Sequence, residues 1–378
     1  MARVFVTGVG IDDAWARAHA AFDGQAAPAT PDGRQDARKV RLPKALAARV
    51  AREDRAILTD ITIRGLMAAS HAMEMAEGSS PFPDEIKQVF TVFTNTETVR
   101  DFHEVLDAFR KARAPGIDSA ALYHRLGEVA ETTHPLRLFR KLPTNTLYHL
   151  SKLFGLTGGG YPLRRMSLGG LTLVEEAFYR LEAADAGAAL LCASGDMLSA
   201  ENYDAFRKMG LLADPEQGGE GVYPVNGTAS LVLETEATLA RTGHRALAEI
   251  TFVRTRFSTD MFTGAEDWAA LHRGLRAAQD GSDTPVVALY DNGAGRLREA
   301  EIAALQQGMP EAETRSYKRQ IGYSAGASAL ADVIAALHDG TIACGRSVVV
   351  QGTGAGTGCG VIALRKTACL AKAAQVAA

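Results

Sequence analysis

Four cysteines are the strongest nucleophiles in the sequence, and the segment Cys192-Ala-Ser-Gly195 sets one of them near a glycine. A catalytic thiol needs a helix amino terminus or a cationic neighbour, which lowers its pKa and holds the thiolate. Cys192 instead ends the apolar run 188–192, and no helical pattern starts after it. We therefore predict that Cys192 is a buried structural thiol. The four cysteines have no metal-ligand spacing, so we expect no structural metal and no disulfides.

Residues 352–358, Gly-Thr-Gly-Ala-Gly-Thr-Gly, are a second candidate for chemistry, because glycine-rich loops can cradle phosphates. No Gly-Lys-Ser/Thr follows them, and the apolar run 361–364 after the turn indicates a strand rather than a helix. The sequence therefore disfavours a nucleotide site, and we expect no cofactor. Close backbone approach between layers explains these glycines better.

Short apolar or β-branched runs alternate with longer helical patterns, which predicts an α/β architecture with largely buried strands. The expected strands are 4–9, 88–93, 188–192, 230–234 and 347–350, and the expected helices are 57–75, 167–184 and one that begins near Ser324. Residues 99–140 are charged and weakly periodic, which indicates a helical excursion over the surface.

Two of the expected helices repeat the same apolar offsets. One carries Leu171, Val174, Phe178 and Leu181, and the other carries Ala327, Leu330, Ile334 and Leu337, at a constant separation of 156 residues. A strand follows each helix, so the pattern indicates two halves built on one plan. We place the boundary after residue 240, which gives an amino-terminal half of 1–240 and a carboxyl-terminal half of 241–378.

The composition is that of an ordinary globular protein. Of 378 residues, 47% are hydrophobic and 22% are charged, and the formal net charge is −3. Nucleic acid is therefore not expected as a partner, because phosphate binding needs a concentrated basic face. No apolar run reaches the length of a membrane span or resembles a signal peptide, and the sparse cysteines fit reduced thiols. These features predict a cytoplasmic location.

Several segments, in order, resemble the β-ketoacyl synthases of fatty-acid and polyketide assembly. They are Val4 to Gly10, Leu142 to Asn145, Leu153 to Gly158, Ala184 to Gly195, Gly227 to Glu234 and Ser316 to Ala327. The similarity covers nearly the whole chain, and the order and spacing are more specific than any single segment. The resemblance implies a thiolase-like fold, in which two similar halves form a layered αβαβα arrangement.

The catalytic positions of this family hold other residue types here. Matching the helix after the turn 165–170 to the family's pattern puts Ser167 where the nucleophilic cysteine belongs, with Met166 as the alternative one residue earlier. The two histidines that stabilise the enolate and the oxyanion are replaced by Tyr290 and Tyr323. Serine needs a neighbouring base to become a useful nucleophile, and a phenol with a pKa near ~10 is a poor substitute for imidazole. The resemblance therefore implies that condensation is absent or very slow.

Lys318 keeps the position of the family's lysine. A lone lysine beside a glycine turn is commonly solvated or ion-paired at the surface. The resemblance instead implies a buried lysine near Ser167, where it would tether the loop or hold a carboxylate. The sequence leaves both interpretations open.

Some lineages of the family pair an active synthase with an inactive homologue, the chain-length factor, which shapes the acyl tunnel. The loss of all three catalytic side chains on an intact scaffold resembles such a subunit, and the short segment Tyr223-Pro-Val-Asn-Gly227 is similar to the abbreviated partner of aryl-polyene type systems. The expected partners are thus an active ketosynthase subunit, in a heterodimer, and acyl carrier protein. Two alternatives are an acyltransferase or ketosynthase-like enzyme that uses Ser167, and a homodimeric acyl-binding scaffold.

Five basic residues cluster along the sequence, namely Arg137, Arg140, Lys141, Arg164 and Arg165. Such a cluster is most often a solvated face. It is also a candidate contact for an acidic carrier protein, because complementary charge steers association.

Overall fold

The computed structural model describes residues 2–12, 40–78, 80–96, 109–113, 115–131, 139–140, 142–213, 220–260, 262–278 and 284–368. The strands are β1 (Val4–Ile11), β2 (Phe90–Asn95), β3 (Gly160–Leu163), β4 (Ala188–Asp196), β5 (Asn226–Thr235), β6 (Ala248–Arg256), β7 (Val286–Ala288), β8 (Glu313–Arg315), β9 (Ser347–Gly354) and β10 (Gly358–Lys366). The helices are α2 (Lys44–Arg49), η2 (Asp54–Ile57), α3 (Asp60–Glu77), α4 (Asp84–Gln88), α6 (Ser119–Glu131), α8 (Thr144–Phe154), η3 (Met166–Leu168), α9 (Gly169–Glu182), α10 (Ala200–Lys208), α11 (Glu236–Thr242), α12 (Ala265–Ala278), α13 (Gly295–Gly308), α14 (Lys318–Ile321), η4 (Ala325–Ala327) and α15 (Ser328–His338). None of the helices in these ranges is long and apolar enough to cross a membrane.

The strands hydrogen-bond in the order β3-β2-β4-β5-β1-β6-β10-β9-β7-β8. The first five strands and the last five have the same order when each set is followed outward from the centre, where β1 pairs with β6. Strands β5, β4, β2 and β3 on one side correspond to β10, β9, β7 and β8 on the other. In both halves a parallel pair lies at the outer end, β2 with β3 and β7 with β8. The edge strands of this ten-stranded sheet are therefore β3 and β8.

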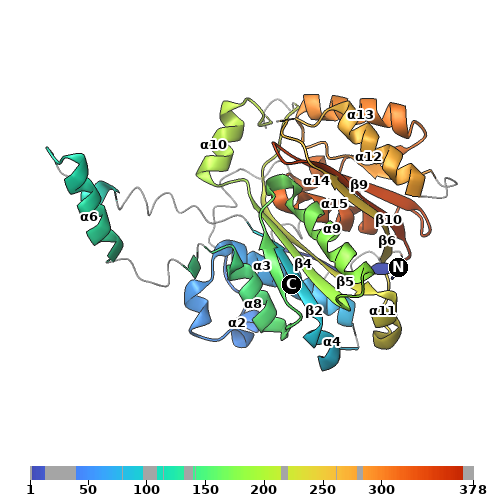
Figure 1. Cartoon of the computed structure of the whole chain (residues 1–378), viewed down its shortest axis with the longest axis horizontal. Coiled ribbons are helices and arrows are strands. Elements are labelled where there is room, and N and C mark those ends of the chain that lie inside the picture. Colours follow the sequence, from blue (N-terminus) through green and yellow to red (C-terminus); the bar gives the residue numbers. More distant parts are fainter. Residues whose placement is uncertain are drawn as a thin grey trace.

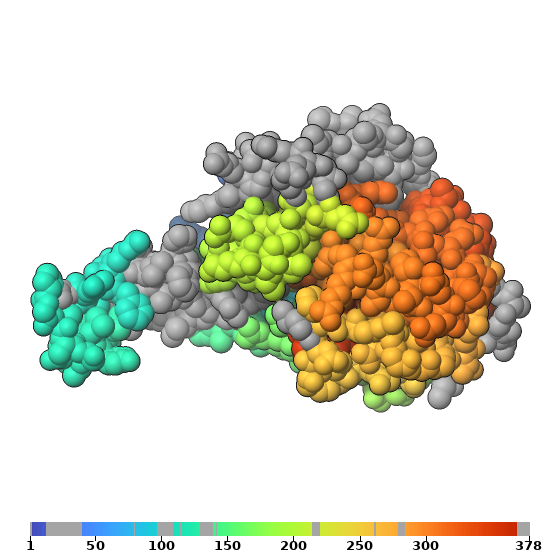
Figure 2. All heavy atoms as spheres, turned by 90° about the horizontal axis from the view of Figure 1, so that it is seen from above, coloured from blue at the N-terminus to red at the C-terminus, as the bar shows by residue number. Residues whose placement is uncertain are grey.

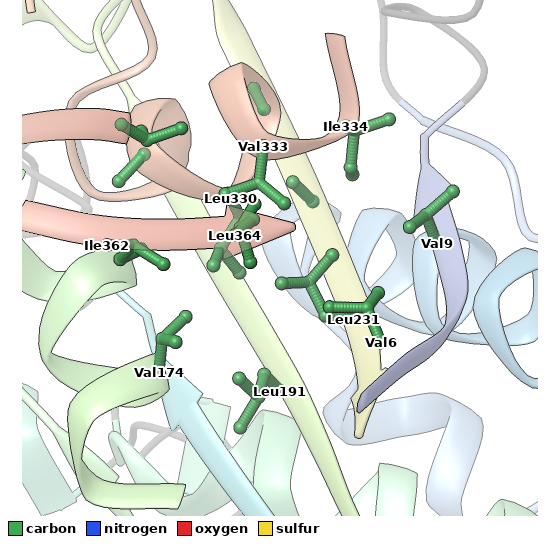
Figure 3. Packing of buried hydrophobic residues seen from close by; sticks show 14 of the residues in the cluster. Val6, Val9, Val174, Leu191, Leu231, Leu330, Val333, Ile334, Ile362 and Leu364 are labelled. Carbon is green, nitrogen blue, oxygen red and sulfur yellow. The ribbon is translucent and has the colours of Figure 1, made fainter. Parts of the chain in front are cut away.

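Helices cover the strands in layers, as Figure 1 shows. Helices α3 and α8 pack on the outer face of the first half, where Leu66 and Leu150 share a buried cluster with β2 and β4. Helices α12 and α13 cover the outer face of the second half. Helices α9 and α15 lie between the two sets of five strands. Val174, Leu330 and Ile334 on these helices share one buried cluster with residues from both sets of strands (Figure 3). This arrangement confirms the predicted α/β fold class with its αβαβα layers.

Helix α15 shows why the centre takes this form. Every residue from Ser328 to Leu337 is buried. A helix that is apolar on every face, apart from Ser328 and Asp332, must be enclosed by protein. By contrast, α6 lies away from the body of the molecule in both views (Figures 1 and 2), and Tyr123 on it is largely exposed.

The predicted repeat is real, but its register was wrong. Strands β4 and β9 begin at Ala188 and Ser347, and the turns before the two central helices begin at Met166 and Ala325, a common separation of 159 residues rather than 156. Helical spacing alone cannot distinguish these values, because a shift of three residues keeps an apolar stripe on the same face. The boundary after residue 240 stays a prediction.

Candidate functional site

The turn that carries Ser167 is a strained elbow. Met166 has φ of +46°, a left-handed backbone conformation that is uncommon for a residue other than glycine and clusters at functional sites. The elbow leaves the Met166 side chain 62% exposed. Ser167 follows it half-buried in η3, directly before α9. Of the two candidates for the nucleophile position, Ser167 is thus the one that turns inward, toward Tyr290.

The side chain of Asn95 holds the elbow at Met166 in place through a hydrogen bond to the residue before it. It is buried at the end of β2, and its Oδ1 accepts a hydrogen bond from the backbone N–H of Arg165 at 3.1 Å. A Cβ added to Gly169 would lie 2.1 Å from Asn95 Cγ, and one added to Gly326 would lie 2.3 Å from Asn95 Nδ2. Because neither glycine has a side chain, the amide of Asn95 fits between the turns η3 and η4. No motif or spacing in the sequence singles out Asn95.

Tyr290 and Tyr323 come together beside Ser167, although they are far apart in the sequence. The Tyr290 hydroxyl donates to the Tyr323 hydroxyl at 2.8 Å, and both side chains are buried. Burial, and then the neighbouring Tyr323, raise the pKa of Tyr290 well above its usual value, and a hydrogen bond with Ser167 opposes that rise. Tyr290 is therefore a neutral hydrogen-bond donor at physiological pH, not a proton acceptor.

Lys318 lies behind this pair of phenols. Its ammonium is buried, forms an ion pair with Asp332 of α15, and lies 4.9 Å from the centre of the Tyr290 ring. The interpretation of Lys318 as a surface group was therefore wrong, and the expectation that it holds a carboxylate is confirmed. Burial raises the pKa of Asp332 to about 6, and Lys318 opposes that rise.

Glu301 of α13 holds the backbone that presents Tyr290. Its two carboxyl oxygens accept hydrogen bonds from the N–H of Tyr290 at 2.6 Å and of Asp291 at 2.9 Å. The side chain is fully buried, and burial raises its pKa to about 8, against the effect of these hydrogen bonds. Neither Glu301 nor Asp332 was predicted from the sequence. A single carboxylate on an otherwise apolar helix, as at Asp332, was the available signal for a buried partner.

We expect Glu301 to make stability depend on pH. Because its pKa is higher in the folded chain than its usual value of 4.5, the folded state binds the extra proton. The stabilisation is complete below about pH 4.5 and is lost as the pH rises through about 8. Urea unfolding at several pH values checks this: relative to Glu301→Gln, which mimics the protonated acid, the wild type should lose stability over that interval. Glu299→Gln, an exposed carboxylate on the same helix, is the control, and a pH-independent difference for Glu301 would contradict the assignment.

Cys192 does not belong to this site. It lies fully buried within β4, with its thiol 4.0 Å from the carbonyl oxygen of Gly65, and burial raises its pKa to about 12. The prediction of a structural thiol is confirmed. Across the ranges that the structure describes, no group of three or more His, Cys, Asp or Glu side chains could hold a metal ion.

The glycine-rich residues 352–358 form the hairpin between β9 and β10. A Cβ added to Gly352 would lie 2.9 Å from Leu171 Cδ1, and one added to Gly354 would lie 3.2 Å from the Leu168 nitrogen. The hairpin thus packs closely against the elbow and the start of α9. This agrees with the structural explanation of the glycines.

The basic residues divide into two places. Arg164 and Arg165 are exposed after the end of β3, whereas the guanidinium of Arg140 donates to the carbonyl oxygen of Ala56 at 2.9 Å. Arg137 and Lys141 lie outside the described residues.

No protein-family model and no curated protein matches the sequence. Several solved structures, however, are similar to the structure of this chain. A β-ketoacyl synthase from Burkholderia phymatum STM815 is 16% identical, with a TM-score of 0.76 over 97% of this chain and 100% of that one. The ishigamide ketosynthase/chain length factor is 16% identical, with a TM-score of 0.70 over 97% and 100%. A third structure is a type II acyl-carrier protein in complex with its ketosynthase bound to the hexaketide. It is 14% identical in sequence, with a TM-score of 0.69 over 97% of this chain and 99% of that one. At these identities the likeness establishes the fold.

Proposed function

We propose that this chain, which has the thiolase-like fold of the β-ketoacyl synthases, is a non-catalytic, chain-length-factor-like subunit. It pairs with an active ketosynthase and supports chain elongation on acyl carrier protein. The observation that carries the proposal is the set of side chains that meet at the elbow, namely Ser167, Tyr290 and Tyr323. All three side chains end in a hydroxyl group, and none carries a thiol or an imidazole.

The chemistry of condensation explains why this matters. The reaction needs a nucleophile that is ionised or readily deprotonated, and groups that accept and return protons near pH 7. The pKa of Tyr290 is raised well above 10, so it cannot deprotonate Ser167. Lys318 is engaged with Asp332, and its ammonium lies over the ring of Tyr290. The scaffold is kept, but neither of these two described residues supplies the base.

Two of the similar structures support the choice of partners. One is described as a ketosynthase/chain length factor, and another as an acyl-carrier protein in complex with its ketosynthase. We extend these pairings to this chain as part of the proposal. The short segment that ends at Gly227 favours a polyene type of assembly system, and a cytoplasmic location belongs to the same proposal.

We expect the purified chain alone to show no condensation of a malonyl extender with an acyl primer. Co-expression with an active ketosynthase subunit should give a stable heterodimer that elongates chains on carrier protein. Ser167→Ala should leave that turnover within about twofold of the wild type, since an inert hydroxyl contributes nothing to the chemical step. Loss of turnover in Ser167→Ala, or condensation by the chain alone, would show that the subunit is catalytic.

Ser167 favours one second candidate, an acyltransferase. The serine is half-buried at the amino terminus of α9, where backbone donors can stabilise an oxyanion. Intact-mass measurement after incubation with an acyl thioester distinguishes the two functions, because a stable ester on Ser167 would support the enzyme. The homodimeric scaffold is distinguished by particle mass with and without the ketosynthase.

A further inference from the structure

Helix α10 lies on the outside of the molecule in both views (Figures 1 and 2), and none of its residues is buried. Two of its ion pairs are internal, since Asp204 binds Arg207 at 2.5 Å and Lys208 at 2.6 Å within the same helix. A helix in a protein gains most of its stability from the packing of an apolar face. Helix α10 is therefore attached weakly to the body, and such an element opens at a low free-energy cost.

One side chain of α10 packs inward. The Phe206 ring is half-buried against an apolar cluster that contains Tyr290 and Tyr323, and its centre lies 6.0 Å from the centre of the Tyr323 ring. This separation is typical of a direct aromatic contact. Both tyrosine side chains are buried, so Phe206 is one of the groups that shield them from solvent.

The backbone of Tyr323 is fixed by a different segment. Its N–H donates to the carbonyl oxygen of Tyr223 at 2.7 Å, and its own carbonyl oxygen accepts from the N–H of Val225 at 3.0 Å. A Cβ added to Gly322 would lie 2.5 Å from Val225 Cγ1, which shows how closely this segment is packed. A motion that uncovers the Tyr323 ring is therefore a motion of the side chains that pack on it.

Helix α10 is attached at its two ends. Before the helix, Ser199 Oγ accepts a hydrogen bond from the N–H of Asn202 at 3.4 Å. After it, the N–H of Val222 donates to the carbonyl oxygen of Leu211 at 2.7 Å. Between the helix and Leu211, Gly210 has φ of +66°, and a Cβ there would meet nothing within 4 Å. Two short attachments, with a glycine and open space beside one of them, form a hinge.

We propose that α10 is a lid over the pair of tyrosines at the candidate site, and that Phe206 is the side chain with which it closes. When α10 moves outward about Ser199 and Gly210, Phe206 leaves the ring of Tyr323, and small molecules reach the hydroxyls of Tyr323 and Tyr290. The inference does not depend on the proposed function. A non-catalytic subunit would keep the lid closed, whereas an acyltransferase would have to open it.

Acetylation of tyrosine hydroxyls by N-acetylimidazole, read by peptide mass mapping of the purified full chain, measures the opening. In the wild type, Tyr123, which is 76% exposed, should react quickly, and Tyr323 should react slowly. Phe206→Ala should raise the rate at Tyr323 at least about tenfold, because the covering ring is gone. Tyr203→Ala removes an exposed ring from the same helix and should leave that rate within about twofold of the wild type. Tyr317, which is buried in the central cluster, should stay unmodified in every variant, and this separates lid opening from global unfolding.

Ser199→Ala tests the lid without a change to the ring. Loss of this helix cap should raise amide hydrogen exchange at residues 204–208 by about fivefold, and acetylation of Tyr323 should rise by about the same factor. Thr235→Ala removes the equivalent cap of α11 and should leave Tyr323 unchanged. If Phe206→Ala does not fold, Ser199→Ala decides the question. Rapid acetylation of Tyr323 in the wild type would overturn the proposal, and so would faster exchange of α10 in Ser199→Ala with no change at Tyr323.

Discussion

Replacement of Lys318 by methionine should lower the free energy of unfolding by about 3–5 kcal/mol, because it leaves the buried Asp332 carboxylate without its cation. The burial of Asp332 is complete, and its pKa is already raised to about 6 with Lys318 present. Removing the lysine raises that pKa further, so the variant should be weakest above pH 6, where folding must keep the carboxylate ionised or force it to take up a proton. Urea unfolding at pH 5 and pH 8 measures both effects.

Two further variants make the Lys318 test specific. Lys318→Met with Asp332→Asn removes both charges and should recover most of the lost stability, since replacing a buried pair is milder than breaking it. Arg319→Met changes the neighbouring residue, whose partly exposed guanidinium lies 3.4 Å from Asp291, and should cost less than about 1 kcal/mol. If Lys318→Met were as mild as Arg319→Met, the ion pair would not stabilise the site as described.

Substitution of Gly160 by alanine should detach β3 from the sheet, at a cost of about 2–5 kcal/mol. Gly160 has φ of +133°, in a region that only glycine adopts readily. A Cβ there would lie 1.8 Å from the carbonyl oxygen of Val92, on the neighbouring strand. Faster amide hydrogen exchange at Tyr161 and Leu163 measures the detachment.

Gly159 provides the matched control for Gly160. It also has a positive φ, +85°, but a Cβ there would meet nothing within 4 Å. Gly159→Ala should therefore cost only the backbone strain of about 1–2 kcal/mol and keep β3 paired. Equal exchange rates in the two variants would contradict the assigned role of the close contact with Val92.

The sequence predicted the layered fold because its strongest signals are buried ones. Residues 188–192 and 230–234 are apolar enough to indicate strands, although β4 and β5 extend beyond both runs, to Asp196 and back to Asn226. The added residues include Ser194 and Thr228, which form a buried hydrogen bond to each other. A hydrophobicity pattern ends where such polar pairs begin, so it shortens strands that tertiary contacts prolong.

The only site residues that could be predicted are those at positions that resemble catalytic positions of the β-ketoacyl synthases. Ser167, Tyr290, Lys318 and Tyr323 were found by resemblance, and the structure brings all four together. Their roles remain predictions. Asn95, Glu301 and Asp332 were not predicted, because each acts through a partner on another element of the fold. The lone carboxylate of Asp332 on an apolar helix indicates that a partner exists, but it does not identify Lys318.

The mirrored strand order has a consequence for biosynthesis. Strand β1 pairs with β5 at Ala229–Thr235 and with β6 at Ala248–Ile250, so its sheet neighbours are synthesised only after the long intervening segment that contains β2, β3 and β4. Its eight residues are all buried in the final structure. The nascent chain must keep this apolar segment from misassociating throughout that delay, which makes slow folding and reliance on chaperones the natural cost of this topology.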